Sequence, residues 1–175
     1  LLKNEIDNDR NEKKWLNSQW NLVKSIYNMI ISILKELTEN ENRVAATPQS
    51  VKDLIKNGAS VNIESGAGDF SFISDDDYKQ SGANICSSPK EAIKDCDIIV
   101  KVNPPSKEEI NTFPEGKAFV SFIQTTKELE IVNRLAKRKI AGFSMHLIPR
   151  TTLAQSMDAL SSQANIAGYK AVLNG

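Results

Sequence analysis

The sequence predicts an α/β fold in which helices cover both faces of a doubly wound, mostly parallel sheet. The first observation is a series of short apolar runs, each of the length of one buried strand, at 29–34, 59–63, 83–86, 97–102, 117–122 and 140–144. The second is that helix-like segments separate these runs, at 47–58, 74–82, 88–94, 106–112 and 126–139. Strands that alternate with helices form right-handed βαβ units, which place the strands parallel in one sheet.

Local signals mark the ends of two of these helices. Thr47, followed by a proline, predicts an N-cap, and Gly58 stands where a left-handed residue ends the helix. Ser74 begins the next helix, which ends at Gly82. The three aspartates at 75–77 raise the alternative of a metal site, but acidic residues in a first turn stabilise the helix dipole. We therefore interpret these aspartates as part of a helix cap.

Composition argues against several classes of function. The chain has 22 basic and 22 acidic residues, so its formal net charge is zero and nothing indicates binding to nucleic acid. Cys86 and Cys96 form no CxxC pair and the chain has one histidine, which makes a zinc site unexpected. Two buried, reduced thiols are the simpler interpretation. No apolar run approaches the roughly 20 residues that cross a bilayer, so we expect a soluble chain.

Residues 1–28 differ in character from the rest. The stretch 1–14 is polar and mixed in charge, as in a linker, and apolar residues then recur at helical spacing from Trp15 to Tyr27. We interpret 1–28 as a linker or extension with a short amphipathic helix that docks on this domain or on a partner. A membrane-surface role is the alternative. The chain begins without Met and without a signal peptide, so we expect a fragment of a longer protein.

The segment Gly66-Ala67-Gly68 follows a strand, as a dinucleotide-binding loop would. The third glycine of a GxGxxG fingerprint would fall at position 71, which is serine, and no long helix follows at once. We expect a turn here instead, and the chain has no other candidate for a Rossmann fingerprint.

The segment 150–175 concentrates the polar groups that suit a binding site. Arg150, Gln155, Asp158 and Ser161 lie close together among small residues, and the last three are spaced by three along one helical face. An apolar stripe of Leu153, Met157, Leu160, Ala164, Ala167 and Ala171 predicts that the segment is helical. The residues alone leave two alternatives open, a ligand site and a buried helix between subunits.

Two blocks carry a resemblance to a known family. Residues 155–172, QSMDALSSQANIAGYKAV, resemble the signature of the NAD(H)-binding component of proton-translocating nicotinamide nucleotide transhydrogenase. Residues 33–36, ILKE, together with 40–51, NENRVAATPQSV, resemble the N-terminal signature that alanine dehydrogenases and transhydrogenases share. The resemblance covers most of the chain from about residue 30 onward.

The resemblance implies roles for particular residues. Arg150, Asp158 and Ser161 would contact the NAD(H) headgroup, and Gln155 would reach toward NADP(H) on a partner domain. Arg150, Gln155 and Asp158 would form the catalytic set, and Ser162 is a further cofactor-binding candidate with a less defined role. Hydride transfer needs two carbon centres that are held close, oriented and dry, and amide and hydroxyl groups can do this without acid–base chemistry.

A second pair of residues suggests a substrate-type pocket. In alanine dehydrogenases the positions of Arg43 and Lys101 hold the substrate, whereas the structural alternative is that both pair with acidic groups such as Glu36. Alanine dehydrogenases also carry an acid–base histidine in the segment that here contains Gln124. The single histidine, His146, lies at a later strand end, where we interpret it as structural.

The resemblance implies that 29–175 is the first half of a transhydrogenase NAD(H) domain, with a flavodoxin-like sheet and a Rossmann domain that follows it. It further implies a homodimer, an NADP(H)-binding domain and a membrane proton-channel domain in the same enzyme, from which this domain extends outside the membrane. The reaction would be hydride transfer between NADH and NADP⁺, coupled to proton movement, and the fragment alone would be inactive. The alternatives are the substrate domain of an alanine-dehydrogenase-like enzyme, which Gln124 argues against, and a non-catalytic dimerisation module, which the polar set at 150–161 argues against.

Overall fold

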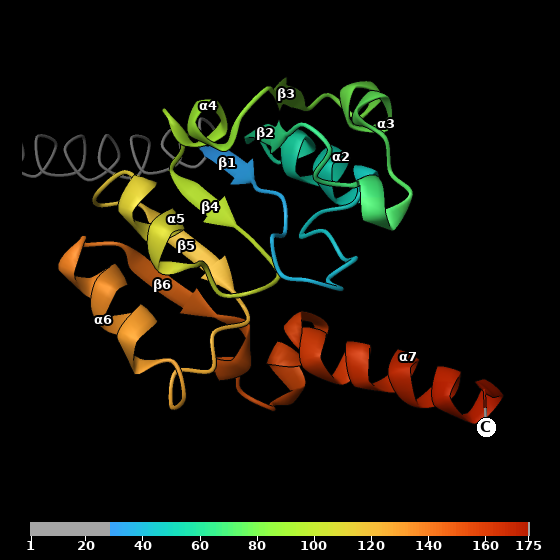
Figure 1. The fold of residues 1–175 in the computed structure, drawn as a ribbon. Coiled ribbons are helices and arrows are strands. Elements are labelled where there is room, and N and C mark those ends of the chain that lie inside the picture. The colour runs from blue at the N-terminus through green and yellow to red at the C-terminus, as the bar shows by residue number, and fades with distance from the viewer. Residues whose placement is uncertain (1–28, 175) are drawn as a thin grey trace, which may run out of the picture.

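The computed structural model describes residues 29–174, so the predicted extension at 1–28 lies outside the described residues. Strands and helices alternate along this stretch, which confirms the predicted α/β class (Figure 1). The strands are β1 Ile30–Ile33, β2 Ser60–Glu64, β3 Asn84–Cys86, β4 Ile98–Val100, β5 Ala118–Ser121 and β6 Ala141–Ser144. The α-helices are α2 Pro48–Lys56, α3 Asp75–Gln80, α4 Pro89–Ile93, α5 Lys107–Thr112, α6 Leu129–Lys137 and α7 Ala159–Asn174. The 3-10 helices are η1 Asp69–Ser71, η2 Met145–Leu147 and η3 Thr152–Met157.

The sheet has six parallel strands in the order β3-β2-β1-β4-β5-β6. A doubly wound parallel sheet was predicted and is confirmed. Its strand order is that of dinucleotide-binding folds, and in this respect it differs from the flavodoxin-like order 2-1-3-4-5 that we expected. The difference arises at β3, which pairs with β2 and therefore stays on the same side of β1. The chain then crosses over, and β4 pairs with the other edge of β1.

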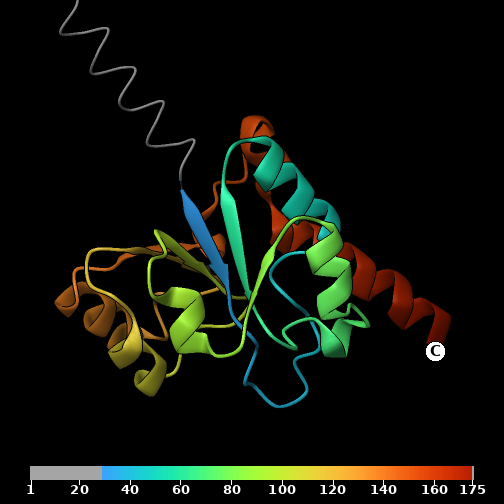
Figure 2. The same cartoon turned by 90° about the horizontal axis from the view of Figure 1, so that it is seen from above.

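The helices form a layer on each face of the sheet. Figure 2 shows α2 and α3 on one side, and α4, α5 and α6 on the other. This arrangement follows from right-handed crossovers, because the chain moves outward from β1 through β3 and then in the opposite direction from β4 to β6. The direction changes between β1 and β4, which makes this pair of strands the switch point of the sheet.

The helix ends follow the predicted local signals. The Thr47 side chain accepts a hydrogen bond from the backbone of Ser50, and Ser74 and Asp77 form a reciprocal capping box at the start of α3. Gly58 and Gly82 follow the two helices with positive φ values of 91° and 92°. The capping interpretation is therefore confirmed for Asp77, and Asp75 and Asp76 lie in the first turn of α3 as expected, where Asp75 also accepts the Gly66 N–H at 2.9 Å.

Two clusters of buried side chains hold the helices to the sheet. One contains Val51 and Tyr78 under α2 and α3, where the Tyr78 hydroxyl donates to the Ala46 carbonyl at 2.7 Å. The other lies under α4, α5 and α6, and includes the stacked rings of Phe113 and Phe119, whose centroids are 5.4 Å apart. Cys86 and Cys96 belong to this second cluster. Both are buried free thiols, as predicted, and burial raises the pKa of each.

The C-terminal segment differs from the single helical stripe that we expected. The helix is interrupted at Asp158, which separates η3 from α7, because the Asp158 side chain bonds to the backbone three residues later. Figures 1 and 2 show α7 extending away from the sheet, and this helix has no buried residue. No helix between residues 29 and 174 is long and apolar enough to cross a membrane.

Candidate functional site

The four residues singled out in the C-terminal segment come together in the structure. Arg150, Gln155, Asp158 and Ser161 line one pocket of about 310 Å³, which Thr151 and Thr152 complete. η3 supplies Gln155, the following turn supplies Asp158, and the first turns of α7 supply Ser161. Ala154 is 4% exposed and anchors η3 to the rest of the fold. The spacing predicted from sequence thus produces one polar pocket, although it does so across a break in the helix.

Hydrogen bonds within the protein fix the position of the Asp158 carboxylate. Its carboxylate accepts hydrogen bonds from the Ser161 backbone N–H at 3.0 Å and from the Ser161 hydroxyl at 2.5 Å. The hydroxyl bond, followed by the backbone bond, lowers the pKa of Asp158, and the charge of Arg150 has a smaller effect. No ion pair joins Arg150 and Asp158 within the described residues. Asp158 therefore caps α7 and lines the pocket at the same time.

Ser162 lies beside this pocket but is not one of its lining residues. Its hydroxyl donates at 3.1 Å to the carbonyl of Asp158, the residue that precedes α7. This bond is local to the start of the helix. The cofactor-binding role expected for Ser162 stays a prediction.

Arg43 and Lys101 line a second, more apolar cavity of about 530 Å³. Its walls include Val100, Val120, Phe122 and Met145 from the strands and their C-terminal ends. The first residues of α7 also reach it, since Ala159 and Gln163 complete the lining. The cavity and the polar pocket therefore lie on either side of the start of α7, at the C-terminal edge of the sheet, where ligands bind in α/β folds.

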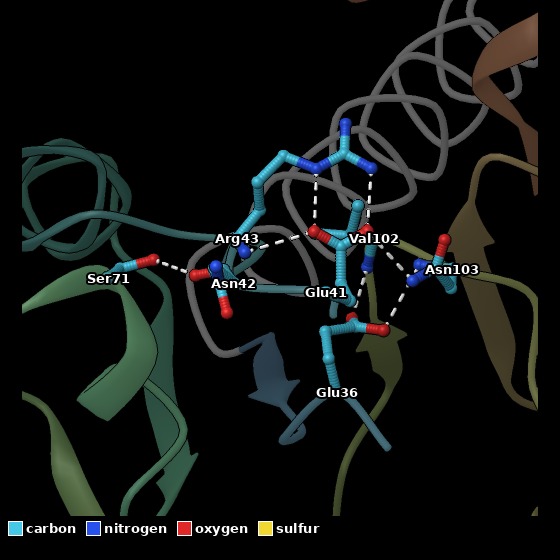
Figure 3. Close-up of polar contacts among 7 residues, drawn as sticks. All are labelled: Glu36, Glu41, Asn42, Arg43, Ser71, Val102 and Asn103. Atoms are coloured by element: carbon cyan, nitrogen blue, oxygen red, sulfur yellow. Dashed lines mark hydrogen bonds and ion pairs between the residues drawn. The ribbon is translucent and has the colours of Figure 1, made fainter. Parts of the chain in front are cut away.

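Both cations of this cavity are paired with carboxylates. The Arg43 guanidinium donates to both oxygens of Glu41, at 2.8 and 2.7 Å, and this bond lowers the pKa of Glu41 to about 2 (Figure 3). Lys101, whose side chain is 2% exposed, bonds to Glu109 at 2.5 Å. The structural alternative named Glu36 as an acidic partner, but the partners are Glu41 and Glu109.

Glu36 has a different role, which the sequence did not indicate. Its carboxylate is buried and accepts hydrogen bonds from the backbone N–H groups of Val102 at 2.6 Å and Asn103 at 3.2 Å. Burial raises the pKa of Glu36, although these two bonds oppose the shift. Asn103 in turn donates its side-chain amide to Glu41 at 2.9 Å (Figure 3). A chain of polar contacts thus joins the loop after β1 to the loop after β4.

Gln124 and His146 border the same region. Both line a pocket of about 350 Å³, together with Arg43, Asn103 and Gln163. The backbone N–H of Gln124 bonds to Glu128 at 2.6 Å, and the His146 ring meets the ring of Phe122 edge-on, with centroids 5.7 Å apart. The aromatic contact is consistent with the structural role expected for His146. The fold nevertheless places this histidine at the candidate site rather than away from it.

Comparison with known proteins gives a consistent result. Residues 32–167 match the family model described as alanine dehydrogenase/PNT, N-terminal domain. Over 145 residues the chain is 44% identical to the NAD(P) transhydrogenase subunit alpha of Haemophilus influenzae, a match that covers 83% of this chain and 28% of that protein. It is 33% identical over 147 residues to the alanine dehydrogenase of Methanococcus maripaludis, covering 84% of this chain and 39% of that protein.

A solved structure shows the same relation. The crystal structure of transhydrogenase from Sinorhizobium meliloti matches with a TM-score of 0.79 and 41% identity, over 83% of this chain and 43% of that chain. The chain therefore spans less than half of the length of each of these relatives. Since the family model covers most of the described residues and the solved relative has the same fold, the chain belongs to the alanine dehydrogenase/PNT N-terminal domain family.

Proposed function

We propose that this chain is the half of a transhydrogenase NAD(H) domain that holds the nicotinamide end of the nucleotide. The complete protein would transfer hydride between NADH and NADP⁺. The observation that carries the proposal is the single pocket lined by Arg150, Gln155, Asp158 and Ser161. The identity of 44% to a transhydrogenase alpha subunit supports it, compared with 33% to an alanine dehydrogenase.

The chemistry of the pocket fits a nicotinamide ring and its ribose. A carboxamide needs both hydrogen-bond donors and acceptors, and the Gln155 amide, the Ser161 hydroxyl and the Asp158 carboxylate offer both. Arg150 adds donors and a positive charge. The bound nucleotide supplies the hydride, so the residues of this chain need only orient the ring and exclude water. The Asp158–Ser161 bonds hold two of these groups in place in advance, which reduces the entropy lost on binding.

Gln155 is proposed to act between two domains. Arg150 and Gln155 make no side-chain hydrogen bond within residues 29–174, so both groups are available to a ligand or to a neighbouring domain. A partner domain that carries NADP(H), a membrane domain that conducts protons and a second copy of this domain would complete the enzyme. The transhydrogenase relatives extend well beyond the part that this chain matches, which is 28% of one and 43% of the other, and this supports the presence of further domains.

The test is hydride transfer in the complete protein. Single-turnover mixing with NADH and an NADP⁺ analogue should give transfer, whereas alanine with NAD⁺ should give no NADH. Gln124 offers no titrating group for alanine oxidation. Robust alanine-dependent formation of NADH would contradict this proposal and favour an alanine-dehydrogenase-like function.

The second candidate is an enzyme that acts like an alanine dehydrogenase. One observation favours it, because Arg43 and Lys101 line one cavity and His146 lies in the adjoining pocket with Arg43. His146 could then replace the acid–base histidine that the Gln124 segment lacks. His146→Ala separates the candidates: it should abolish alanine oxidation if this second function is correct, and should leave transfer between NADH and NADP⁺ largely unchanged if the first is.

A further inference from the structure

The switch point of the sheet is the place where an open α/β fold normally binds its ligand. It lies in the crevice beyond the C-terminal ends of the strands at which the strand order reverses. In this chain those strands are β1 and β4, and the loops that follow them begin at Leu34 and Lys101. The sheet has the strand order of a dinucleotide-binding fold but no glycine fingerprint after β1.

A side chain of the protein itself occupies this crevice. Glu36 comes from the loop after β1, is 6% exposed, and directs its carboxylate at the backbone of the loop after β4 (Figure 3). One oxygen accepts the N–H of Val102 at 2.6 Å, and the other accepts the N–H of Asn103 at 3.2 Å. Two consecutive backbone N–H groups that converge on one anion form an arrangement that proteins use to bind phosphates and carboxylates.

We propose that Glu36 serves as a built-in anion, and that its carboxylate closes the switch-point crevice to the anionic groups of a ligand. This proposal rests on the proposed function only in that it explains why a dinucleotide would present its nicotinamide end to this domain and its pyrophosphate elsewhere. The crevice itself can be tested without any nucleotide.

The charged side chains around the crevice also disfavour the binding of an anion from solution. Glu41 lies beside Glu36, accepts the Asn103 amide at 2.9 Å and adds a second carboxylate to the region (Figure 3). The nearby cations do not offset this for an incoming phosphate, because Arg43 is bound to Glu41 and Lys101 to Glu109. A phosphate that approached the Val102 and Asn103 N–H groups would therefore meet the Glu36 carboxylate, which both blocks and repels it, while the Arg43–Glu41 and Lys101–Glu109 pairs are close to neutral and supply no compensating positive charge.

The experiment removes the built-in anion and supplies a small one from solution. In the 175-residue chain, Glu36→Ala should leave two buried N–H groups without an acceptor and lower Tm by roughly 5–10 °C. Sodium formate, compared with sodium chloride at the same ionic strength, should then restore part of this loss in a saturable manner. For an ion of this size the Kd should be no tighter than about 1 mM. In the same titration, the amide NMR signals of Val102 and Asn103 should shift.

Two variants keep the test decisive. Glu64→Ala is the matched control, since the Glu64 carboxylate, at the end of β2, also accepts a backbone N–H, that of Lys35 at 2.9 Å, but makes no bond to the Val102 and Asn103 N–H groups. Formate should not raise its Tm beyond the effect of chloride. Glu36→Gln keeps the shape of the side chain, so it covers the case in which the alanine variant does not fold. It should be less stable than the wild type and unresponsive to formate, because the amide still fills the crevice.

Three results would overturn the proposal. The first is an alanine variant that folds but shows no formate-specific recovery. The second is an equal formate response in Glu64→Ala, and the third is a glutamine variant as stable as the wild type. None of these depends on NADH binding, so failure here and failure of the proposed function can be distinguished.

Discussion

The two polar regions at the C-terminal edge of the sheet satisfy their charged groups in opposite ways. Around Glu36 and Lys101, the side chains are buried and each charge has a partner within the fold. Around Arg150 and Gln155, the side chains are exposed and make no such bonds within residues 29–174. The difference indicates that the first region stabilises the crossing loops and that the second is available to bind something else. A cation at a strand end is therefore not by itself a sign of a substrate site.

The largest expected effect comes from breaking a charge pair in the buried region. Glu109→Ala should lower the free energy of unfolding by about 2–3 kcal/mol, because it leaves the Lys101 ammonium buried without its carboxylate. Urea denaturation of the 175-residue chain measures this. Glu108→Ala, at the exposed neighbouring position, should change stability by less than about 0.5 kcal/mol. Equal effects of the two variants would show that the Lys101–Glu109 pair does not stabilise the loop.

In the exposed region, the comparison predicts a loss of rate with little loss of stability. In the complete protein, Gln155→Ala should slow hydride transfer on the order of 100-fold, because a small displacement between two rings has an effect of this size. NADH affinity should change little, since Arg150, Asp158 and Ser161 still line the pocket. Single-turnover kinetics, together with equilibrium NADH binding, separates the two quantities. Gln49→Ala, on the exposed side of α2, is the control.

Should NADH binding fall as far as the rate does, Gln155 would belong to the NAD(H) pocket itself. The proposed role between two domains would then be wrong. The pocket would still be a binding site, but its contact with a second nucleotide would have to come from another residue.

The two carboxylates Glu36 and Glu41 should affect stability in opposite ways as the pH changes. The pKa of Glu41 falls from its ordinary value of 4.5 to about 2, so its ion pair contributes stability above pH 4.5 and loses it as the pH falls toward 2. The pKa of Glu36 is raised by burial, so the sign is opposite: its contribution is complete at low pH and declines as the pH rises through that pKa. Between pH 4.5 and 2, the wild type should lose about 1–2 kcal/mol more than Glu41→Gln, after allowance for the exposure of Arg43.

Urea unfolding at several pH values between 2 and 5 provides the measurement. Glu39→Gln, an exposed position in the same loop, is the matched control and should follow the wild-type curve. Parallel curves for the wild type and Glu41→Gln would mean that the Arg43–Glu41 contact contributes no net stability in solution.

The smallest effect is expected for NADH binding to the exposed pocket of the isolated 175-residue chain. NADH should bind to the 175 residues weakly, with a Kd well above 1 µM, because this chain has no glycine loop at a helix N-terminus to hold the pyrophosphate. Titration calorimetry tests this directly. Sub-micromolar affinity would show that the nicotinamide-end pocket alone supplies most of the binding energy.

Short-range features of this molecule were predictable from sequence, whereas long-range ones were not. The starts of α2 and α3 followed from Thr47 and Ser74, because these caps bond to residues three positions ahead. The grouping of Arg150, Gln155, Asp158 and Ser161 was also predictable, since the four span only twelve positions. The break at Asp158 was missed because the apolar stripe continues through it, although aspartate is one of the favoured N-cap residues.

Other features depend on which strands become neighbours. The Glu36 carboxylate meets Val102 across 66 positions of sequence, and no local pattern near Glu36 predicts that contact. The placement of β3 outside β2 was likewise missed, because strand lengths and helix caps are compatible with either order. The partners of Arg43 and Lys101 follow from the same long-range arrangement, which explains why the sequence suggested Glu36 instead of Glu41 and Glu109.

The central position of β1 has a consequence for synthesis on the ribosome. Ile30–Ile33 is the first strand of the sheet to be made, but its partner β4 is Ile98–Val100. At a translation rate of roughly 5–20 residues per second, β4 is synthesised about 3–13 seconds after β1, and the edge of β1 that pairs with β4 stays open for that time. During this interval β2 can pair with one edge of β1 only. The backbone N–H and C=O groups of the other edge stay unpaired, next to isoleucines that are buried in the finished fold. The nascent chain therefore passes through a window in which a chaperone, or a second nascent chain, competes with β4 for the centre of the sheet.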